Sequence, residues 1–144
     1  MGAAQLARCR LVDYRIRGYR APQSVLAPEL RDQSLCWQNF EWFASSAASL
    51  GMRLPSLRAR LARLPIHFDD YGLHRGELTW DAWRTAALDM ARQEPYVAFG
   101  LHDCYAPHWL PRYQALLDEL AGLDGVRLRT LDDLANDLHL AAGV

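Results

Sequence analysis

Short apolar segments alternate with longer helical patterns along the 144 residues of this chain, and this alternation constrains the fold more than any other feature. Continuously apolar or β-favouring segments predict strands at residues 10–19, 36–43, 64–68, 96–101 and 126–129. Helices are predicted at 26–35, 55–62, 79–92, 109–120 and from 130 onward, with a loop at 45–53. Because strand, loop and helix in repeated order are typical of parallel βα units, the sequence predicts an α/β fold.

The limits of the helices are marked most clearly in the second half of the chain. Thr79 is a suitable N-cap for the helix that ends near residue 92. Gly122 follows a run of apolar residues at helical spacing and predicts the end of that helix. Thr130, with Asp133 three residues later, forms an acidic version of the capping box and predicts the start of the last helix.

All 16 basic residues of the chain are arginines, and 17 acidic residues balance them to a net charge of −1. The absence of lysine excludes Schiff-base and pyridoxal-phosphate chemistry and phosphate loops of the Walker type, because each requires a lysine amine. The balanced charge also gives no clustered positive surface of the kind that nucleic acid requires. We therefore expect no nucleic-acid partner.

No apolar run approaches the roughly 18 residues that a membrane-spanning helix requires. Arginines interrupt the amino-terminal segment, where a secretory signal would be apolar. The three cysteines, Cys9, Cys36 and Cys104, form no CxxC pair and are expected to be free thiols. We expect a single soluble domain over residues 1–144, located in the cytoplasm and without a membrane partner.

Polar side chains follow three of the predicted strands at the point where each strand ends. These are Arg20 after the first strand, Asp69 and Asp70 after the third, and His102 and Asp103 after the fourth. Because parallel strands end at one edge of a sheet, we expect these groups to surround a single pocket. A histidine in such a pocket suits general acid–base chemistry when a neighbouring carboxylate sets its tautomer, and an arginine can bind a carboxylate. Adjacent carboxylates point apart, so one of the aspartate pair is expected to face the pocket.

Other interpretations of the same residues remain open at this stage. His67 and His74, on either side of the aspartate pair, could complete a zinc site, and His102 and Asp103 could bind a metal together with His108. The cysteine that follows Asp103 could act as a nucleophile, although a nucleophile and its base usually come from separate segments. Each group could also be a helix cap, a surface ion pair or a packed loop residue.

Several short motifs occur at these strand ends in a characteristic order. The segment GYRAPQ at residues 18–23 comes first, LPI at 64–66 precedes the aspartate pair, and FGLHD lies at 99–103. They are followed by LP at 110–111 and by VRLRTLDDL at 126–134. These segments resemble the last three motifs and the closing part of the polysaccharide deacetylase, or NodB-homology, family. The resemblance covers nearly the whole chain but only the carboxy-terminal half of the family domain.

The resemblance implies a partial (β/α) barrel of the glycoside hydrolase/deacetylase type, with parallel βα units. It implies metal-dependent hydrolysis of N-acetyl groups on a carbohydrate substrate, in which His102 is the general acid that protonates the leaving amine. Arg20 would orient the aspartate that acts as the base, and Asp69 or Asp70 would support that network. Asp103, next to the histidine, is a further catalytic candidate.

The resemblance also implies substrate contacts and a cofactor. Leu101 would line the pocket for the acetyl methyl group, and Tyr19 and Trp109 are the other candidates for contact with the sugar. The family uses a divalent metal, zinc or a similar ion, held by an aspartate and a histidine pair in its first two motifs. Neither of those motifs is found in this sequence.

Half of a closed barrel would expose two sheet edges and one apolar face. We therefore expect the chain to form a homo-oligomer or to pair with a complementary amino-terminal half. The alternative to a catalytic role is a non-catalytic remnant that acts as a binding or assembly module on the same scaffold.

Overall fold

The computed structural model describes residues 16–21 and 39–143, which belong to two compact units. One unit comprises Met1–Leu64 together with Thr130–Val144, and the other comprises Pro65–Arg129. The helix predicted at 26–35 and most of the strand predicted at 10–19 lie outside the described residues. Within the described ranges, no helix is long and apolar enough to cross a membrane. The organisation of both units as a single domain stays a prediction.

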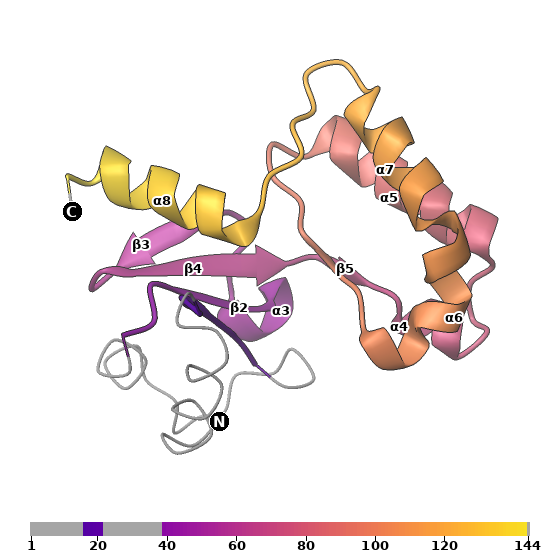
Figure 1. Cartoon of the computed structure of the whole chain (residues 1–144), viewed down its shortest axis with the longest axis horizontal. Coiled ribbons are helices and arrows are strands. Elements are labelled where there is room, and N and C mark those ends of the chain that lie inside the picture. Colours follow the sequence, from indigo (N-terminus) through magenta and orange to yellow (C-terminus); the bar gives the residue numbers. More distant parts are fainter. Residues whose placement is uncertain (1–15, 22–38, 144) are drawn as a thin grey trace. The chain divides into compact units, whose positions relative to one another are not determined.

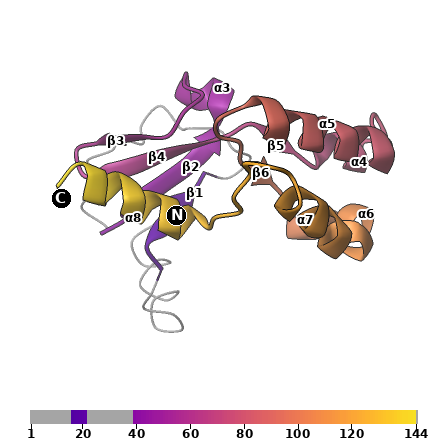
Figure 2. The same ribbon diagram turned by 90° about the horizontal axis from the view of Figure 1, so that it is seen from above.

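The first unit is built on a four-stranded sheet with the strand order β1-β2-β4-β3. Its strands are β1 (Gly18–Arg20), β2 (Trp42–Ser46), β3 (Ser56–Arg58) and β4 (Leu61–Ile66). β1 and β2 are parallel, whereas β3 and β4 form an antiparallel hairpin. The short helix α3 (Ala47–Leu50) follows β2, and helix α8 (Leu131–Ala141) contacts β2 and β3 (Figure 1). Figure 2 shows α8 lying along the strands of this sheet.

Three predictions for the first unit need correction. Among the described residues of the strand predicted at 36–43, only Trp42 and Phe43 lie in a strand. The β3–β4 hairpin replaces the helix predicted at 55–62, and α3 lies within the predicted loop at 45–53. Ala59 and Arg60, which connect the two strands, both have positive φ angles of 48° and 67°. Two positive φ angles in a two-residue connection are typical of a type I′ hairpin turn. The helix α3 begins at a serine cap, because Ser46 accepts a hydrogen bond from the backbone N–H of Ser49 at 3.1 Å.

Apolar side chains on and next to β1, β2 and β4 pack into the core of the first unit. The buried members are Ala21, Phe40, Phe43 and Leu61, with Ile16, Tyr19 and Leu50 packed against them. Gly18 pairs with Trp42 in the register of β1 and β2. A Cβ atom at Gly18 would lie 1.8 Å from Cε2 of the Trp42 indole. This close approach explains why the strand contains a glycine at that position.

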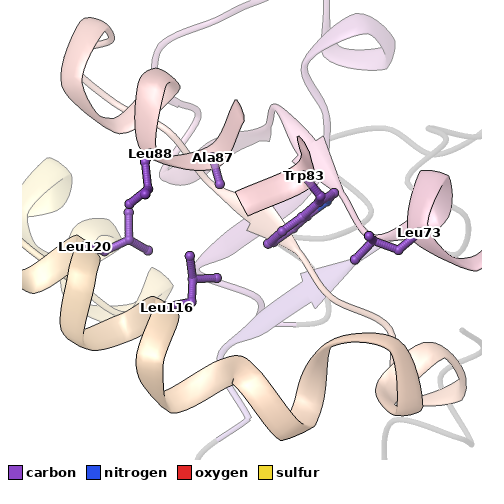
Figure 3. Packing of buried hydrophobic residues seen from close by; sticks show 6 residues of the cluster. All are labelled: Leu73, Trp83, Ala87, Leu88, Leu116 and Leu120. Atoms are coloured by element: carbon purple, nitrogen blue, oxygen red, sulfur yellow. The ribbon is translucent and has the colours of Figure 1, made fainter. Parts of the chain in front are cut away.

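The second unit combines a two-stranded parallel sheet with several helices. β5 (Phe68–Asp69) pairs with β6 (Phe99–Gly100), and the helices are α4 (Tyr71–His74), α5 (Trp80–Gln93), α6 (Ala106–Trp109) and α7 (Tyr113–Ala121). Helices α5 and α7 lie side by side, and their facing side chains form the core (Figure 3). Its buried residues are Leu73, Trp83, Ala87, Leu88, Leu116 and Leu120.

The helix limits predicted from local signals are confirmed. Thr79 caps α5 by accepting a hydrogen bond from the backbone N–H of Ala82 at 3.2 Å. Thr130 caps α8 in the same way through the backbone N–H of Asp133 at 3.1 Å, and α7 ends before Gly122. These caps satisfy backbone groups that have no partner inside the helix.

Three other element predictions need correction. The helix predicted at 109–120 begins with α6 and a 3₁₀ turn at Leu110–Arg112 before α7 starts. Pro107 and Pro111 each stand near the start of a new helical segment, where the missing proline N–H leaves no bond unmade. Only Phe99–Gly100 of the strand predicted at 96–101 is paired, and residues 126–129 form no strand. In that last segment Leu128 is exposed, so the apolar alternation there does not mark a buried sheet face.

The structure confirms an α/β fold with parallel strands, and it adds the antiparallel hairpin that the sequence pattern did not predict. The strands of the described residues are divided between two separate sheets and form no closed barrel. The parallel pair of the second unit is the feature that positions the candidate site, because two polar segments follow the ends of its strands.

Candidate functional site

Asp70 and His102 meet where the parallel strands β5 and β6 end. The register aligns Asp69 with Gly100, so the next residues of both strands leave the same edge of the sheet. The Asp70 side chain is fully buried. Its Oδ2 atom accepts the backbone N–H of His102 at 2.9 Å, and its Oδ1 atom lies 2.6 Å from the ring Nδ1. The buried carboxylate therefore holds both the backbone and the ring of the histidine.

This contact determines which nitrogen of His102 can take part in chemistry. A carboxylate accepts hydrogen bonds, so the proton of the bonded ring lies on Nδ1 and Nε2 is left for a ligand. The side chain of His102 is 28% exposed, which makes it accessible, whereas Asp70 is not. The carbonyl oxygen of His102 accepts the backbone N–H of Tyr105 at 3.0 Å and the indole N–H of Trp109 at 3.3 Å. The backbone N–H, the ring and the carbonyl oxygen of His102 are therefore each held by a hydrogen bond.

The two adjacent aspartates have different environments. Asp69 accepts the backbone N–H of Tyr71 through Oδ1 at 3.0 Å, and its carbonyl accepts the indole N–H of Trp83 at 2.7 Å. Asp70, as described above, is bound to His102. Of the pair left open by the sequence, Asp70 therefore contacts the histidine and Asp69 stabilises the turn into α4.

Asp103 is exposed and its Oδ1 atom accepts the backbone N–H of Cys104 at 2.8 Å. The carboxylate that orients the ring of His102 thus comes from a separate segment, 32 residues away in sequence, and not from the adjacent aspartate. Cys104 is an exposed free thiol. Cys9 and Cys36 lie outside the described residues.

The other predicted site residues have packing roles. Leu101 and Trp109 pack against the core of the second unit, and the Trp109 ring lies 5.3 Å from the ring of Tyr113. Tyr19 packs in the first unit against Phe43, with ring centroids 5.8 Å apart. Arg20 ends β1 of the first unit, and its juxtaposition with His102 stays a prediction.

A group of aromatic rings that the sequence pattern did not indicate lies next to His102. The Tyr105 ring is 5.3 Å from the His102 ring and is stacked on His74, with centroids 4.0 Å apart and planes 11° apart. Tyr71 lies 6.2 Å from Tyr105, and His108 lies 5.7 Å from His74. Tyr71 and His74 are three residues apart, and so are Tyr105 and His108. This spacing in the sequence could have indicated that the rings of each pair lie side by side.

The surroundings of Tyr105 raise the pKa of its hydroxyl further above neutral. Desolvation raises the pKa of Tyr105 above its ordinary value, and nearby acidic groups that include Asp70 and Asp69 raise it further. The sign follows from the charge of tyrosinate, which is disfavoured both away from water and beside carboxylates. The Tyr105 hydroxyl is therefore a hydrogen-bond donor throughout the neutral pH range.

No three His, Cys, Asp or Glu side chains of residues 16–21 and 39–143 come together in a way that could hold a metal ion. Neither local metal set considered from the sequence, around His67 and His74 or around His102 and His108, forms such a group. The ring of His67 instead contacts Tyr96 edge-on, with centroids 5.4 Å apart. The residues described therefore do not by themselves fit the divalent ion that the deacetylase resemblance implies.

Comparison with known proteins gives a likeness of fold. No family model matches the chain, and no curated protein sequence matches it. The structure is similar to the 4-α-glucanotransferase of Thermococcus litoralis, with a TM-score of 0.59 and 15% sequence identity. The match covers 91% of this chain and 22% of that one. The chain thus resembles in fold about a fifth of the length of that enzyme.

Proposed function

We propose that this chain is the carboxy-terminal part of a polysaccharide deacetylase-like protein, which hydrolyses N-acetyl groups on carbohydrate with His102 as the general acid. The observation that supports the proposal is the pair formed by the buried Asp70 and the accessible His102. A histidine oriented by a carboxylate from another segment is typical of acid–base catalysis. The sequence motifs and the fold likeness point to carbohydrate as the substrate.

The chemistry assigned to His102 is a single proton transfer. Hydrolysis of an N-acetyl group breaks the bond between the acyl carbon and the nitrogen, adds water to the acyl carbon and yields acetate and a free amine. The ring, protonated at Nε2, donates that proton to the departing nitrogen while Asp70 keeps the other proton on Nδ1. Leu101, next to His102, is proposed to contact the acetyl methyl group, and Trp109 and Tyr19 the sugar.

Polarisation of the acetyl carbonyl and activation of water need groups beyond those described. A divalent ion would polarise the acetyl carbonyl and activate water in the family that the motifs resemble. No set of described residues can hold that ion. We assign this function, and the base that Arg20 would orient, to a complementary amino-terminal half.

Acetate release from N-acetylglucosamine oligomers tests the proposal. The chain is assayed alone and with the amino-terminal half of a NodB-type deacetylase domain, with a divalent ion present in both cases. His102→Ala should lower the rate by about 10²- to 10⁴-fold, as expected for loss of a general acid. Asp70→Asn should lower it as well, because an amide can present an N–H to the ring and reverse its tautomer. Activity that is unchanged in His102→Ala contradicts the assigned role.

His139→Ala is a matched control, because its ring is bonded to the Arg60 carbonyl at 3.0 Å and the proposed reaction assigns it no part. This variant should retain full activity. A second candidate function, a non-catalytic carbohydrate-binding module, is favoured by the exposed aromatic rings beside His102. Sugar binding without acetate release under both conditions would support that second function and overturn the first.

A further inference from the structure

The aromatic rings beside His102 form a continuous group with one half-buried end and one exposed end. We define the ring cluster as Tyr71, His74, Tyr105 and His108. Tyr105 is half-buried and adjoins the His102 ring, whereas Tyr71, His74 and His108 are exposed. Tyr71 has 48% of its surface exposed, and its ring lies 6.2 Å from the rings of His74 and Tyr105. The cluster lies wholly within the second unit.

The polar ends of these rings have no partner within the part of the chain that the structure describes. No side-chain hydrogen bond of Tyr71, His74, Tyr105 or His108 is formed among those residues, although the rings contact one another closely. Each ring therefore presents an apolar face together with a free donor or acceptor. This combination matches the surface of a pyranose, which has an apolar face of C–H groups and a rim of hydroxyls.

The charges near the cluster favour a neutral ligand. Desolvation is the main cause that raises the pKa of Tyr105, the carboxylates of Asp70 and Asp69 contribute to the rise, and Asp103 is exposed on the adjoining turn. Single-stranded nucleic acid also stacks on aromatic rings, but it requires a positively charged groove. Carboxylates beside the rings oppose phosphate and leave a neutral sugar as the occupant that fits.

We propose that the ring cluster is a binding platform for a second sugar ring of the oligosaccharide whose N-acetyl group lies at His102. The inference rests on the proposed function for the identity of the sugar. Tyr105, which touches both His102 and His74, connects the reacting position to the platform. The chain consequently prefers oligosaccharides to monosaccharides, because a single sugar cannot occupy both positions.

The test compares binding of the N-acetylglucosamine tetramer with binding of the monomer by isothermal titration calorimetry, without reference to turnover. The tetramer should bind about tenfold more tightly than the monomer, the effect of one stacked ring. Tyr105→Ala and His74→Ala should each remove that advantage. Tyr105→Phe and His74→Phe keep the rings and should retain most of it. Circular dichroism verifies that each variant is folded.

Arg75→Ala is the matched control, because Arg75 follows α4 directly, is exposed and pairs only with Glu77 among the interactions described for it. It should bind the tetramer like the unaltered chain. Equal affinity for monomer and tetramer, no saturable binding of the tetramer, or full tetramer binding by Tyr105→Ala and His74→Ala would overturn the platform. Tighter binding of an oligothymidine would overturn it in favour of nucleic acid.

The two proposals fail independently. If tetramer binding does not depend on the rings but acetate release still depends on His102, the platform is overturned and the deacetylase function is retained. Ring-dependent tetramer binding without acetate release supports the platform and overturns catalysis.

Discussion

The two compact units achieve their stability by different means. The first unit depends on backbone pairing in a four-stranded sheet, with a small core of Phe40, Phe43 and Leu61 beside it. The second unit has only two short paired strands, and its helices α5 and α7 supply most of the buried side chains. The candidate site is attached to the second unit, so its geometry depends on helix packing more than on sheet pairing.

Trp83 illustrates how the second unit depends on helix packing. Its side chain is fully buried, it is stacked on Phe68 with ring centroids 5.2 Å apart, and its indole N–H binds the Asp69 carbonyl. It therefore joins the helical core to the strand that leads to Asp70. We therefore expect a disturbance of this core to disrupt the geometry of the candidate site. The sheet of the first unit should be affected less.

The largest effect is expected for Trp83→Ala. Removal of a buried tryptophan leaves a cavity and should lower the free energy of unfolding by about 3–5 kcal/mol. Hydrogen exchange measured by mass spectrometry should show the loss of protection mainly within residues 65–129. Trp80→Ala, which removes a half-buried ring from the same helix, should cost less. Equal loss of protection in both units would show that they unfold as one body.

A smaller effect is expected for Gly18→Ala in the first unit. The added Cβ would overlap the Trp42 indole, whose N–H binds Asp132 of α8, so the ring must move and the sheet must adjust. Overpacking of this kind should cost about 1–3 kcal/mol, measured by urea unfolding. Gly122→Ala is the control in the second unit, because the nearest atom to its added Cβ is 3.4 Å away and its φ is −81°. That control should be close to neutral or slightly stabilising.

The sequence predicted those parts of the fold that depend on local signals. The caps at Thr79 and Thr130 and the end of α7 at Gly122 were predicted because each cap bonds within its own turn. The β3–β4 hairpin was missed because its two-residue turn is Ala59-Arg60, and the usual signal for such a turn is Asn-Gly. The strand predicted at 126–129 is wrong because β-favouring residues alone do not supply a neighbouring strand.

The candidate site was predictable in part for a similar reason. The rule that polar groups follow parallel strand ends placed Asp70 and His102 together, and the structure confirms their contact. Which aspartate of the pair would face the histidine depends on the register of β5 and β6, and no local pattern gives that register. The ring cluster was missed because one pair lies on α4, the other spans a 3₁₀ turn and α6, and the two pairs meet only through tertiary packing.

The smallest effect concerns the ion pair of Arg17 and Glu41, which tests whether the first unit also depends on charge. The hydrogen bond from Arg17 holds the pKa of Glu41 below its ordinary value of 4.5, and Arg17 also binds Asn136 of α8 at 2.6 Å. A carboxyl whose pKa is lowered by folding adds stability above its unfolded pKa, and that stability is lost as the pH falls through the folded pKa.

Glu41→Gln should therefore lower the unfolding temperature slightly at neutral pH and make no difference in acid, below the folded pKa. Because both side chains are about a third or more exposed, we expect less than about 1 kcal/mol. Asp89→Asn, which removes the exposed partner of Arg92 in the second unit, is the matched control and should change stability by a few tenths of a kcal/mol at most. A Glu41→Gln effect of the same size in acid and at neutral pH would mean that Glu41 acts through shape and not through charge. In that case the first unit would depend on backbone pairing and packing alone.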